Sequence, residues 1–212
     1  MTPRVVDKEE KRLAIIQAAA QVFAAKGYRA ATMDQVGRQA KVGKGTVYLY
    51  FKSKEELFLA VFDWFSRDLG RQVEEALDKA GGSAKQRLSS FIESSLAAFD
   101  QMEKLFPLFM EFWAASGPGA GRGSLGQALI RFYRDFGVMI EEVIEAGVVS
   151  GEFRTDVNAR AVAGVLIGAL DGLCLQGWFD SEVDVQAWGR SFLEALFRGL
   201  NPRTGLAEEV GS

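Results

Sequence analysis

The chain has 212 residues, of which 48% are hydrophobic and 25% are charged, and this composition supports one or two packed domains. It has no histidine and a single cysteine, Cys174, which excludes a Ser-His-Asp triad, an intrachain disulfide and a Cys/His zinc site. Residues 1–55 carry a net charge of +6 and residues 56–212 a net charge of -9. The basic first part favours nucleic acid as a partner. The charged N-terminus lacks a secretory signal, and with the lone cysteine it predicts a cytoplasmic protein.

The first predicted helix is amphipathic, because its apolar residues recur three or four positions apart. These residues are Leu13, Ile16, Ala20 and Phe23. Asp7 and Glu10 have the spacing of a capping box at its start. We expect the helix to end at Lys26, because Gly27 can adopt the left-handed conformation that ends helices.

Two short helices separated by a glycine follow. Thr32 and Gln35 repeat the capping-box spacing and predict a helix over residues 32–40. Gly43 marks a tight turn before a third helix over 44–50. The inward positions of the pair are expected to be Met33, Val36, Ala40, Val47 and Phe51.

The rest of the chain is predicted to be helical. Ser53 and Glu56 cap a long helix over 53–79, which residues 81–83 break. No stretch has the period of two that strands require. Further helices are expected over 84–103, 105–116, 124–149, 157–179 and 184–199, with a flexible glycine-rich loop at 117–123 and a frayed tail from 201. The sequence therefore predicts an all-α fold.

The outer side of the third helix carries residues suited to a DNA groove. If Val47 and Phe51 face inward, the outward residues are Lys44, Gly45, Thr46, Tyr48 and Leu49. Lysine and hydroxyl groups reach phosphates or base edges, glycine permits close approach of the backbone, and leucine can contact a thymine methyl group. Lys54 opposes the dipole of the long helix that it opens, and a nearby phosphate would reverse that disadvantage.

A specific set of residues in this region matches a known family. The set comprises Ala20, Phe23, Gly27, Tyr28, Ala31, Thr32, Val36, the run VGKGTVY over 42–48, Tyr50, Phe51 and the run SKEEL over 53–57. This stretch resembles the DNA-binding domain of the TetR family of bacterial transcriptional regulators. A weaker match covers residues 145–147, the GEFR run over 151–154 and residues 161–179.

The resemblance implies a homodimer on a palindromic operator, a four-helix interface formed by the last two long helices of each subunit, and a small-molecule inducer site in the C-terminal part. The family's DNA-contacting positions match Thr32, Met33, Lys44, Thr46, Tyr48, Leu49 and Lys54. We accordingly expect three parts: a helix-turn-helix DNA-binding domain (1–55), joined by the long helix to an α-helical ligand-binding and dimerisation domain (56–200), and a flexible tail (201–212). A short helix-turn-helix pattern is by itself also compatible with a structural two-helix corner.

Aromatic residues are concentrated in the middle of the acidic part. Their helical spacing fits ordinary core packing, and together they also fit a pocket for a planar or greasy effector, such as an aromatic compound, a fatty-acyl derivative or a cationic drug. The candidate ligand-binding residues are Phe65, Phe91, Phe99, Phe106, Phe109, Trp113, Tyr133 and Phe136. Candidates for polar specificity are Glu93, Glu111, Arg131 and Arg134, each of which could equally face solvent.

The last two helices carry the predicted subunit interface. Gly164, Gly168 and Gly172 lie four apart and form a smooth strip that allows close packing of another backbone. The apolar run before Asp171 is too short to span a bilayer. The interface residues are predicted to be Gly164, Gly168, Gly172, Ile167, Trp188, Phe192 and Leu196.

Taken together, the sequence predicts a ligand-responsive DNA-binding regulator and not an enzyme, with no cofactor and no metal. We expect a repressor that is released from its operator by a small hydrophobic or aromatic effector. Alternatives are an activator, a helical adaptor of the same fold that binds a protein partner, and an enzyme acting on a hydrophobic substrate. The sequence does not specify the operator or the effector.

Overall fold

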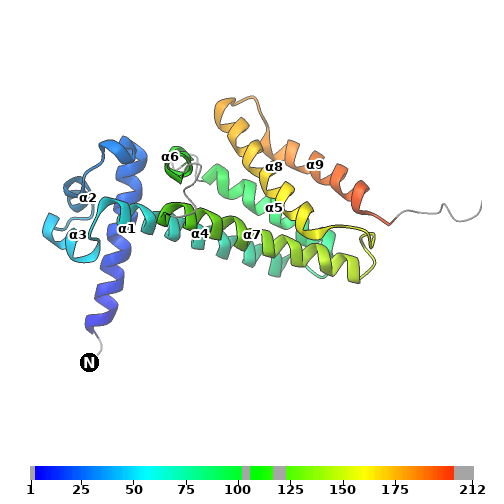
Figure 1. Ribbon diagram of the computed structural model, residues 1–212, viewed down its shortest axis with the longest axis horizontal. Coiled ribbons are helices and arrows are strands. Elements are labelled where there is room, and N and C mark those ends of the chain that lie inside the picture. Colours follow the sequence, from blue (N-terminus) through cyan, green and yellow to red (C-terminus); the bar gives the residue numbers. More distant parts are fainter. Residues whose placement is uncertain (1–2, 102–105, 117–122, 203–212) are drawn as a thin grey trace, which may run out of the picture. The chain divides into compact units, whose positions relative to one another are not determined.

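The computed structural model describes residues 3–101, 106–116 and 123–202, and the side chains in these ranges other than those of 3–7 and 99–101. Within these ranges it has nine helices and no strands, which confirms the predicted all-α fold (Figure 1). The helices are α1 (Pro3–Ala30), α2 (Met33–Gln39), α3 (Lys44–Tyr50), α4 (Lys54–Lys79), α5 (Ala84–Gln101), α6 (Phe106–Ser116), α7 (Ser124–Val149), α8 (Ala159–Phe179) and α9 (Val185–Leu200).

Polar caps explain why several helices begin where the sequence predicted. Thr32 and Gln35 form the expected capping box of α2, with the Gln35 N–H donating to Thr32 Oγ at 3.3 Å. The Asn158 side chain accepts from the Ala161 N–H at 3.0 Å at the start of α8, and the Asp184 side chain accepts from Ala187 N–H at 2.8 Å at the start of α9. Each cap satisfies a backbone N–H that the first helical turn leaves without a partner.

The predicted bounds of α1 are wrong at both ends. The helix begins at Pro3, so Asp7 lies inside it and is not its cap. At the other end, Gly27 interrupts the helix with φ 76° and ψ 152° as expected, but a further turn follows through Ala30. From α4 onward, the predicted bounds agree with the observed ones within a residue or two. The predicted loop at 117–123 and the tail lie almost wholly outside the described residues.

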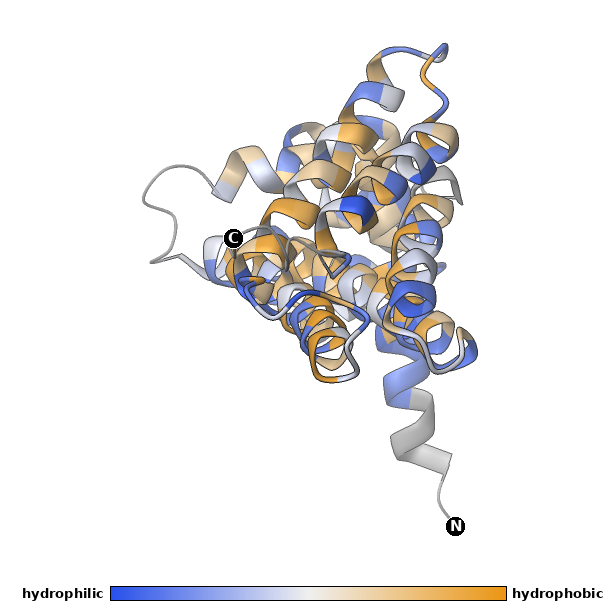
Figure 2. Ribbon diagram, turned by 90° about the vertical axis from the view of Figure 1, so that its right-hand side faces the viewer, coloured by the Kyte–Doolittle hydropathy of each residue, from blue (hydrophilic) through white to orange (hydrophobic). Residues whose placement is uncertain are grey.

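The chain packs into two compact units. Unit 1 comprises Met1–Asp68 and Gln101–Phe132, and unit 2 comprises Leu69–Asp100 and Tyr133–Ser212. Helix α6 therefore packs with the N-terminal helices, whereas the boundary predicted after Glu55 would separate them. That boundary stays a prediction about function. Along the helices, hydrophobic and hydrophilic residues are interleaved, as expected of amphipathic segments (Figure 2).

The GEFR run has a structural role in unit 2. The carboxylate of Glu152 accepts hydrogen bonds from the N–H groups of Ala84 at 2.9 Å and Lys85 at 3.3 Å, and it thereby caps α5. The hydrogen bond from the Ala84 N–H lowers the pKa of Glu152. Phe153 is buried against Gly147, and Arg154 binds the carbonyl of Gly199 at the end of α9 at 2.9 Å. These contacts fix the ends of two helices to one turn.

Candidate DNA-binding surface and subunit interface

Helices α2 and α3 are locked together by a close backbone contact. The Val42 N–H donates to the Gly37 carbonyl at 2.8 Å, and a Cβ atom at Gly37 would lie 3.0 Å from the Val42 carbonyl oxygen. Val36 and Val47 are fully buried between the helices. The pair therefore has the fixed geometry that a recognition helix needs.

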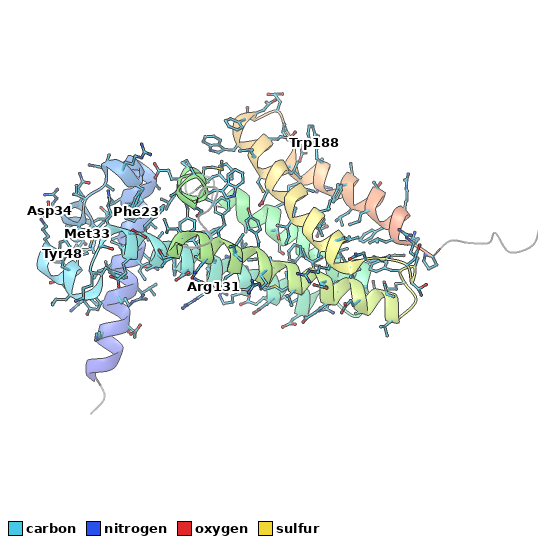
Figure 3. All side chains as sticks on the ribbon, viewed as in Figure 1. Phe23, Met33, Asp34, Tyr48, Arg131 and Trp188 are labelled. Atoms are coloured by element: carbon cyan, nitrogen blue, oxygen red, sulfur yellow. The ribbon has the colours of Figure 1, made fainter. Side chains whose placement is uncertain are left out.

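The predicted outward residues of α3 share an exposed surface. Lys44 and Gly45 are exposed, Thr46 is half-buried, and Tyr48 is 41% exposed (Figure 3). Leu49 is 76% exposed, so most of its apolar side chain is accessible to a binding partner. A Cβ atom at Gly45 would meet no atom within 4 Å. The outer side of α3 is therefore free to lie in a groove of DNA.

The two predicted contacts at the start of α2, its N-cap Thr32 and its first residue Met33, differ in accessibility. Thr32 is exposed, and its Oγ accepts the capping hydrogen bond from Gln35. Met33 is only 5% exposed, so its side chain belongs to the core of unit 1. The helical apolar pattern placed Met33 correctly, whereas the DNA contact implied by family position does not agree with this burial.

Lys54 has internal partners. Its ammonium group donates to the carbonyl oxygens of Tyr28 at 2.7 Å, Arg29 at 3.0 Å and Ala31 at 3.0 Å. It also lies 4.6 Å from the centroid of the Tyr28 ring. A lysine ammonium has three N–H donors, and all three are used here. In this structure the Lys54 side chain therefore binds the end of α1, and its predicted phosphate contact stays a prediction.

The predicted ligand-binding residues fall into separate groups. In unit 1, three of these residues belong to an aromatic cluster on α4, α6 and α7, which consists of Phe62, Phe65, Phe106, Phe109, Phe112 and Phe132. Its tightest pair is Phe62 and Phe112, whose rings are stacked with their centroids 3.8 Å apart. In unit 2, the rings of Phe91 and Phe136 are 6.3 Å apart. Trp113 is 51% exposed, so the described residues cover only about half of its surface. The side chain of Phe99 lies outside the described residues.

A polar pair in unit 2 was not predicted as such. The Tyr133 hydroxyl donates to Asp171 Oδ2 at 2.7 Å, between α7 and α8. Burial raises the pKa of Asp171, and burial together with the hydrogen bond to Asp171 raises the pKa of Tyr133. The signal in the sequence was Asp171, the single charged residue within residues 161–179.

The glycine strip of α8 is open within the described chain. A Cβ atom at Gly164, Gly168 or Gly172 would meet nothing within 4 Å. Large apolar side chains on the same helix are also exposed, with Val165 at 71% and Phe179 at 73%. Of the remaining predicted interface residues, Trp188 is 50% exposed (Figure 3), Phe192 is 37% exposed, Leu196 is half-buried and Ile167 is buried.

Helix α8 is long and apolar enough to cross a membrane by length and composition alone, although Asp171 interrupts its apolar run. Soluble proteins contain helices that pass the same test, so this is weak evidence for a membrane. Only 11% of the apolar window is buried inside the structure. The helix therefore presents an uncovered apolar surface.

Comparisons with known proteins identify both parts of the chain. Residues 15–61 match the bacterial regulatory proteins of the tetR family, and residues 84–204 match the C-terminal part of BetI-type transcriptional repressors. A fatty acid metabolism regulator protein of Bacillus subtilis is 26% identical over 200 residues, covering 92% of this chain and 97% of that protein.

Solved structures share the fold. The regulator FadR from Bacillus subtilis in complex with stearoyl-CoA has a TM-score of 0.71 and 25% identity, covering 89% of this chain and 99% of FadR. A transcriptional regulator from Pseudomonas aeruginosa PAO1 has a TM-score of 0.79 and 23% identity, covering 91% of this chain and 90% of that one. The chain belongs to the tetR family of bacterial regulatory proteins and is a DNA-binding transcriptional regulator, not an enzyme.

Proposed function

We propose that the protein is a repressor that binds a palindromic operator as a homodimer and is released by a hydrophobic effector. The observation that carries this proposal is the exposed outer surface of α3, on a helix that the Gly37 contact holds rigidly. The similarity of residues 84–204 to BetI-type repressors supports repression rather than activation.

In this proposal, α3 enters the major groove. Lys44 binds a phosphate, Thr46 and Tyr48 offer hydroxyl groups to phosphates or base edges, and Leu49 covers a thymine methyl group. Gly45 lets the backbone approach the DNA, and the exposed Thr32 hydroxyl contacts the phosphate backbone beside the groove. Lys54 acts indirectly, because its ammonium group holds the end of α1.

We propose that the open face of α8, together with exposed residues of α9, forms the subunit interface. Glycines cost a helix roughly 1 kcal/mol each relative to alanine. Among the residues that the structure describes, none comes within 4 Å of a Cβ atom at Gly164, Gly168 or Gly172. A second copy packed on this face would use that space and would cover Val165 and Phe179. This account also explains the apolar composition of α8 without a membrane and is compatible with a cytoplasmic protein.

We propose a hydrophobic effector with a long acyl or aromatic portion. The aromatic cluster of unit 1 supplies apolar surface on α4, α6 and α7, and stearoyl-CoA is bound by the similar FadR of Bacillus subtilis. Stearoyl-CoA is therefore the first probe to test. Release of operator DNA by stearoyl-CoA, with coenzyme A alone as the control, would support an acyl effector.

The experiment that tests the proposed function is selection of bound DNA from a random oligonucleotide pool, followed by sequencing. A specific dimer enriches a sequence with two inverted half-sites whose centres are about one helical turn, roughly 34 Å, apart. Enrichment of a single unpaired half-site would contradict the dimeric reading. No enrichment at low salt would contradict specific DNA binding and favour a helical adaptor with a protein partner.

A further inference from the structure

The end of α1 is held from two sides by opposite charges. Gly27 breaks the helix, and the turn that follows is closed by a hydrogen bond from the Ala31 N–H to the Gly27 carbonyl at 3.2 Å. The first N–H of this turn, that of Tyr28, donates to the carboxylate of Glu111 on α6. The carbonyl groups at the other end of the turn accept hydrogen bonds from Lys54.

The backbone conformation at position 27 favours glycine, and the missing side chain leaves room for this contact. Its φ of 76° lies in the left-handed region, and a Cβ atom there would lie 2.9 Å from Glu111 Oε1. The Glu111 carboxylate therefore lies directly against the backbone of Gly27 and Tyr28. Glu111 and Tyr28 are 83 positions apart in the chain, so this contact is made only when α6 packs against α1 within unit 1.

The residue next to Glu111 strengthens the same attachment. Phe112 is 1% exposed and stacks on Phe62 of α4 at 3.8 Å, and it also lies 5.3 Å from Phe58. The Phe58 ring in turn stacks on Tyr28 at 4.3 Å. Helix α6 thus contacts the turn at Tyr28 in two ways: Glu111 binds it directly, and Phe112 contacts it through Phe58.

We propose that Glu111 is the positioning residue through which α6 controls the placement of the recognition helix. The proposal rests on the function proposed above. Lys54 is the first residue of α4, and α3 ends only a few residues before it. A shift of the Tyr28 turn therefore moves Lys54 and, with it, the end of α3.

Breaking this contact costs free energy, so the position of α6 with Glu111 on the Tyr28 turn is favoured. A charge-assisted hydrogen bond is stronger than a neutral one, and the Tyr28 N–H loses its acceptor if α6 moves away. With Glu111 seated, the turn and Lys54 are fixed in the arrangement described here. With Glu111 withdrawn, the turn keeps its own hydrogen bond from the Ala31 N–H to the Gly27 carbonyl, the hydrogen bonds from Lys54 and the stacking of Tyr28 on Phe58, but it loses its attachment to the Glu111 carboxylate.

Reciprocal coupling provides a test that needs no effector. If α6 and the DNA-binding helices are coupled, DNA that fixes α3 must also stabilise α6. Hydrogen exchange of the full-length protein is measured by mass spectrometry with and without the operator enriched by selection. The variants are Glu111→Ala, Glu111→Gln, which keeps an acceptor oxygen without the charge, and Glu142→Ala, which removes an exposed carboxylate from α7 as the matched control.

In the wild-type protein and in Glu142→Ala, we expect the operator to slow exchange in residues 106–116 by about fivefold or more, the lower end of typical coupling. In Glu111→Ala the slowing in 106–116 is lost, while slowing in residues 33–50 persists. Glu111→Gln retains part of it, and this variant carries the test if Glu111→Ala does not fold.

Two results would overturn the proposal. One is slowing in 106–116 that is equal in the wild type and both Glu111 variants. The other is a wild-type protein that binds the operator, with slowing in 33–50 and none in 106–116. Both differ from failure of the proposed function, in which the wild-type protein binds no specific DNA.

Discussion

Replacing Lys44 and Lys54 separately by alanine distinguishes a DNA contact from an internal support. Each phosphate contact contributes about 0.9 to the slope of log affinity against log salt concentration. A homodimer carries two copies of Lys44, so Lys44→Ala should reduce the magnitude of the slope by about 1.8. Its melting temperature should stay unchanged, because the Lys44 side chain is exposed.

Lys54→Ala should behave in the opposite way. It removes three hydrogen bonds from the ammonium group to the carbonyls of Tyr28, Arg29 and Ala31. Because this site is partly exposed, we expect a loss of about 2 kcal/mol, near the value of a single hydrogen bond to a charged group. For a chain of this size the melting temperature then falls by roughly 4–8 °C.

The assay is fluorescence anisotropy with the enriched operator at several salt concentrations, combined with thermal unfolding of each variant. The slope for Lys54→Ala should match the wild type even where the affinity is weaker. A reduced slope for Lys54→Ala with an unchanged melting temperature would refute the assignment and restore a phosphate contact to Lys54.

Three further predictions concern unit 2. The pKa of Glu152 is lowered in the folded state. The ionised carboxylate therefore stabilises the fold above the unfolded pKa near 4.5, and this stabilisation is lost as the pH falls through the folded pKa. Thermal unfolding should show that Glu152→Gln is less stable than the wild type at pH 7 and closer to it near pH 3. Burial raises the pKa of Asp171, so the ionised carboxylate destabilises the fold once the pH rises above the pKa that Asp171 has in the unfolded chain. Asp171→Asn keeps an acceptor for the Tyr133 hydroxyl. This variant should raise the melting temperature at pH 7 but not at pH 3. Gly168→Leu fills the open strip of α8; analytical ultracentrifugation should show a weakened dimer, and an unchanged dimer would exclude this strip from the interface.

Local signals in the sequence predicted most of the fold. Capping residues such as Thr32 and Ser53, and the helix-breaking Gly27, act within a few residues of themselves, so their effects can be read from the sequence. The packing of Val36 and Val47 followed in the same way from helical periodicity. Helix starts from α2 onward were accordingly predicted well.

The contacts that the sequence did not predict join distant residues. Lys54 binds carbonyl groups that lie 23 to 26 positions earlier, and backbone carbonyls have no signature in a sequence. From the sequence, Glu111 was a candidate polar residue for an effector or a solvent-facing residue. Its partner in the structure, the backbone N–H of Tyr28, has no signature in the sequence. Such partners become visible only when the packing of α1, α4 and α6 is known.

The most direct test of the central claim compares the full enriched operator with a version in which one half-site is scrambled. The account predicts that two chains bind the full operator cooperatively and that scrambling one half-site weakens binding by at least about a hundredfold, which is equivalent to roughly 2.7 kcal/mol. Equal affinity for the two DNAs, with one chain bound to each, would contradict a homodimer that reads a palindrome through two copies of α3.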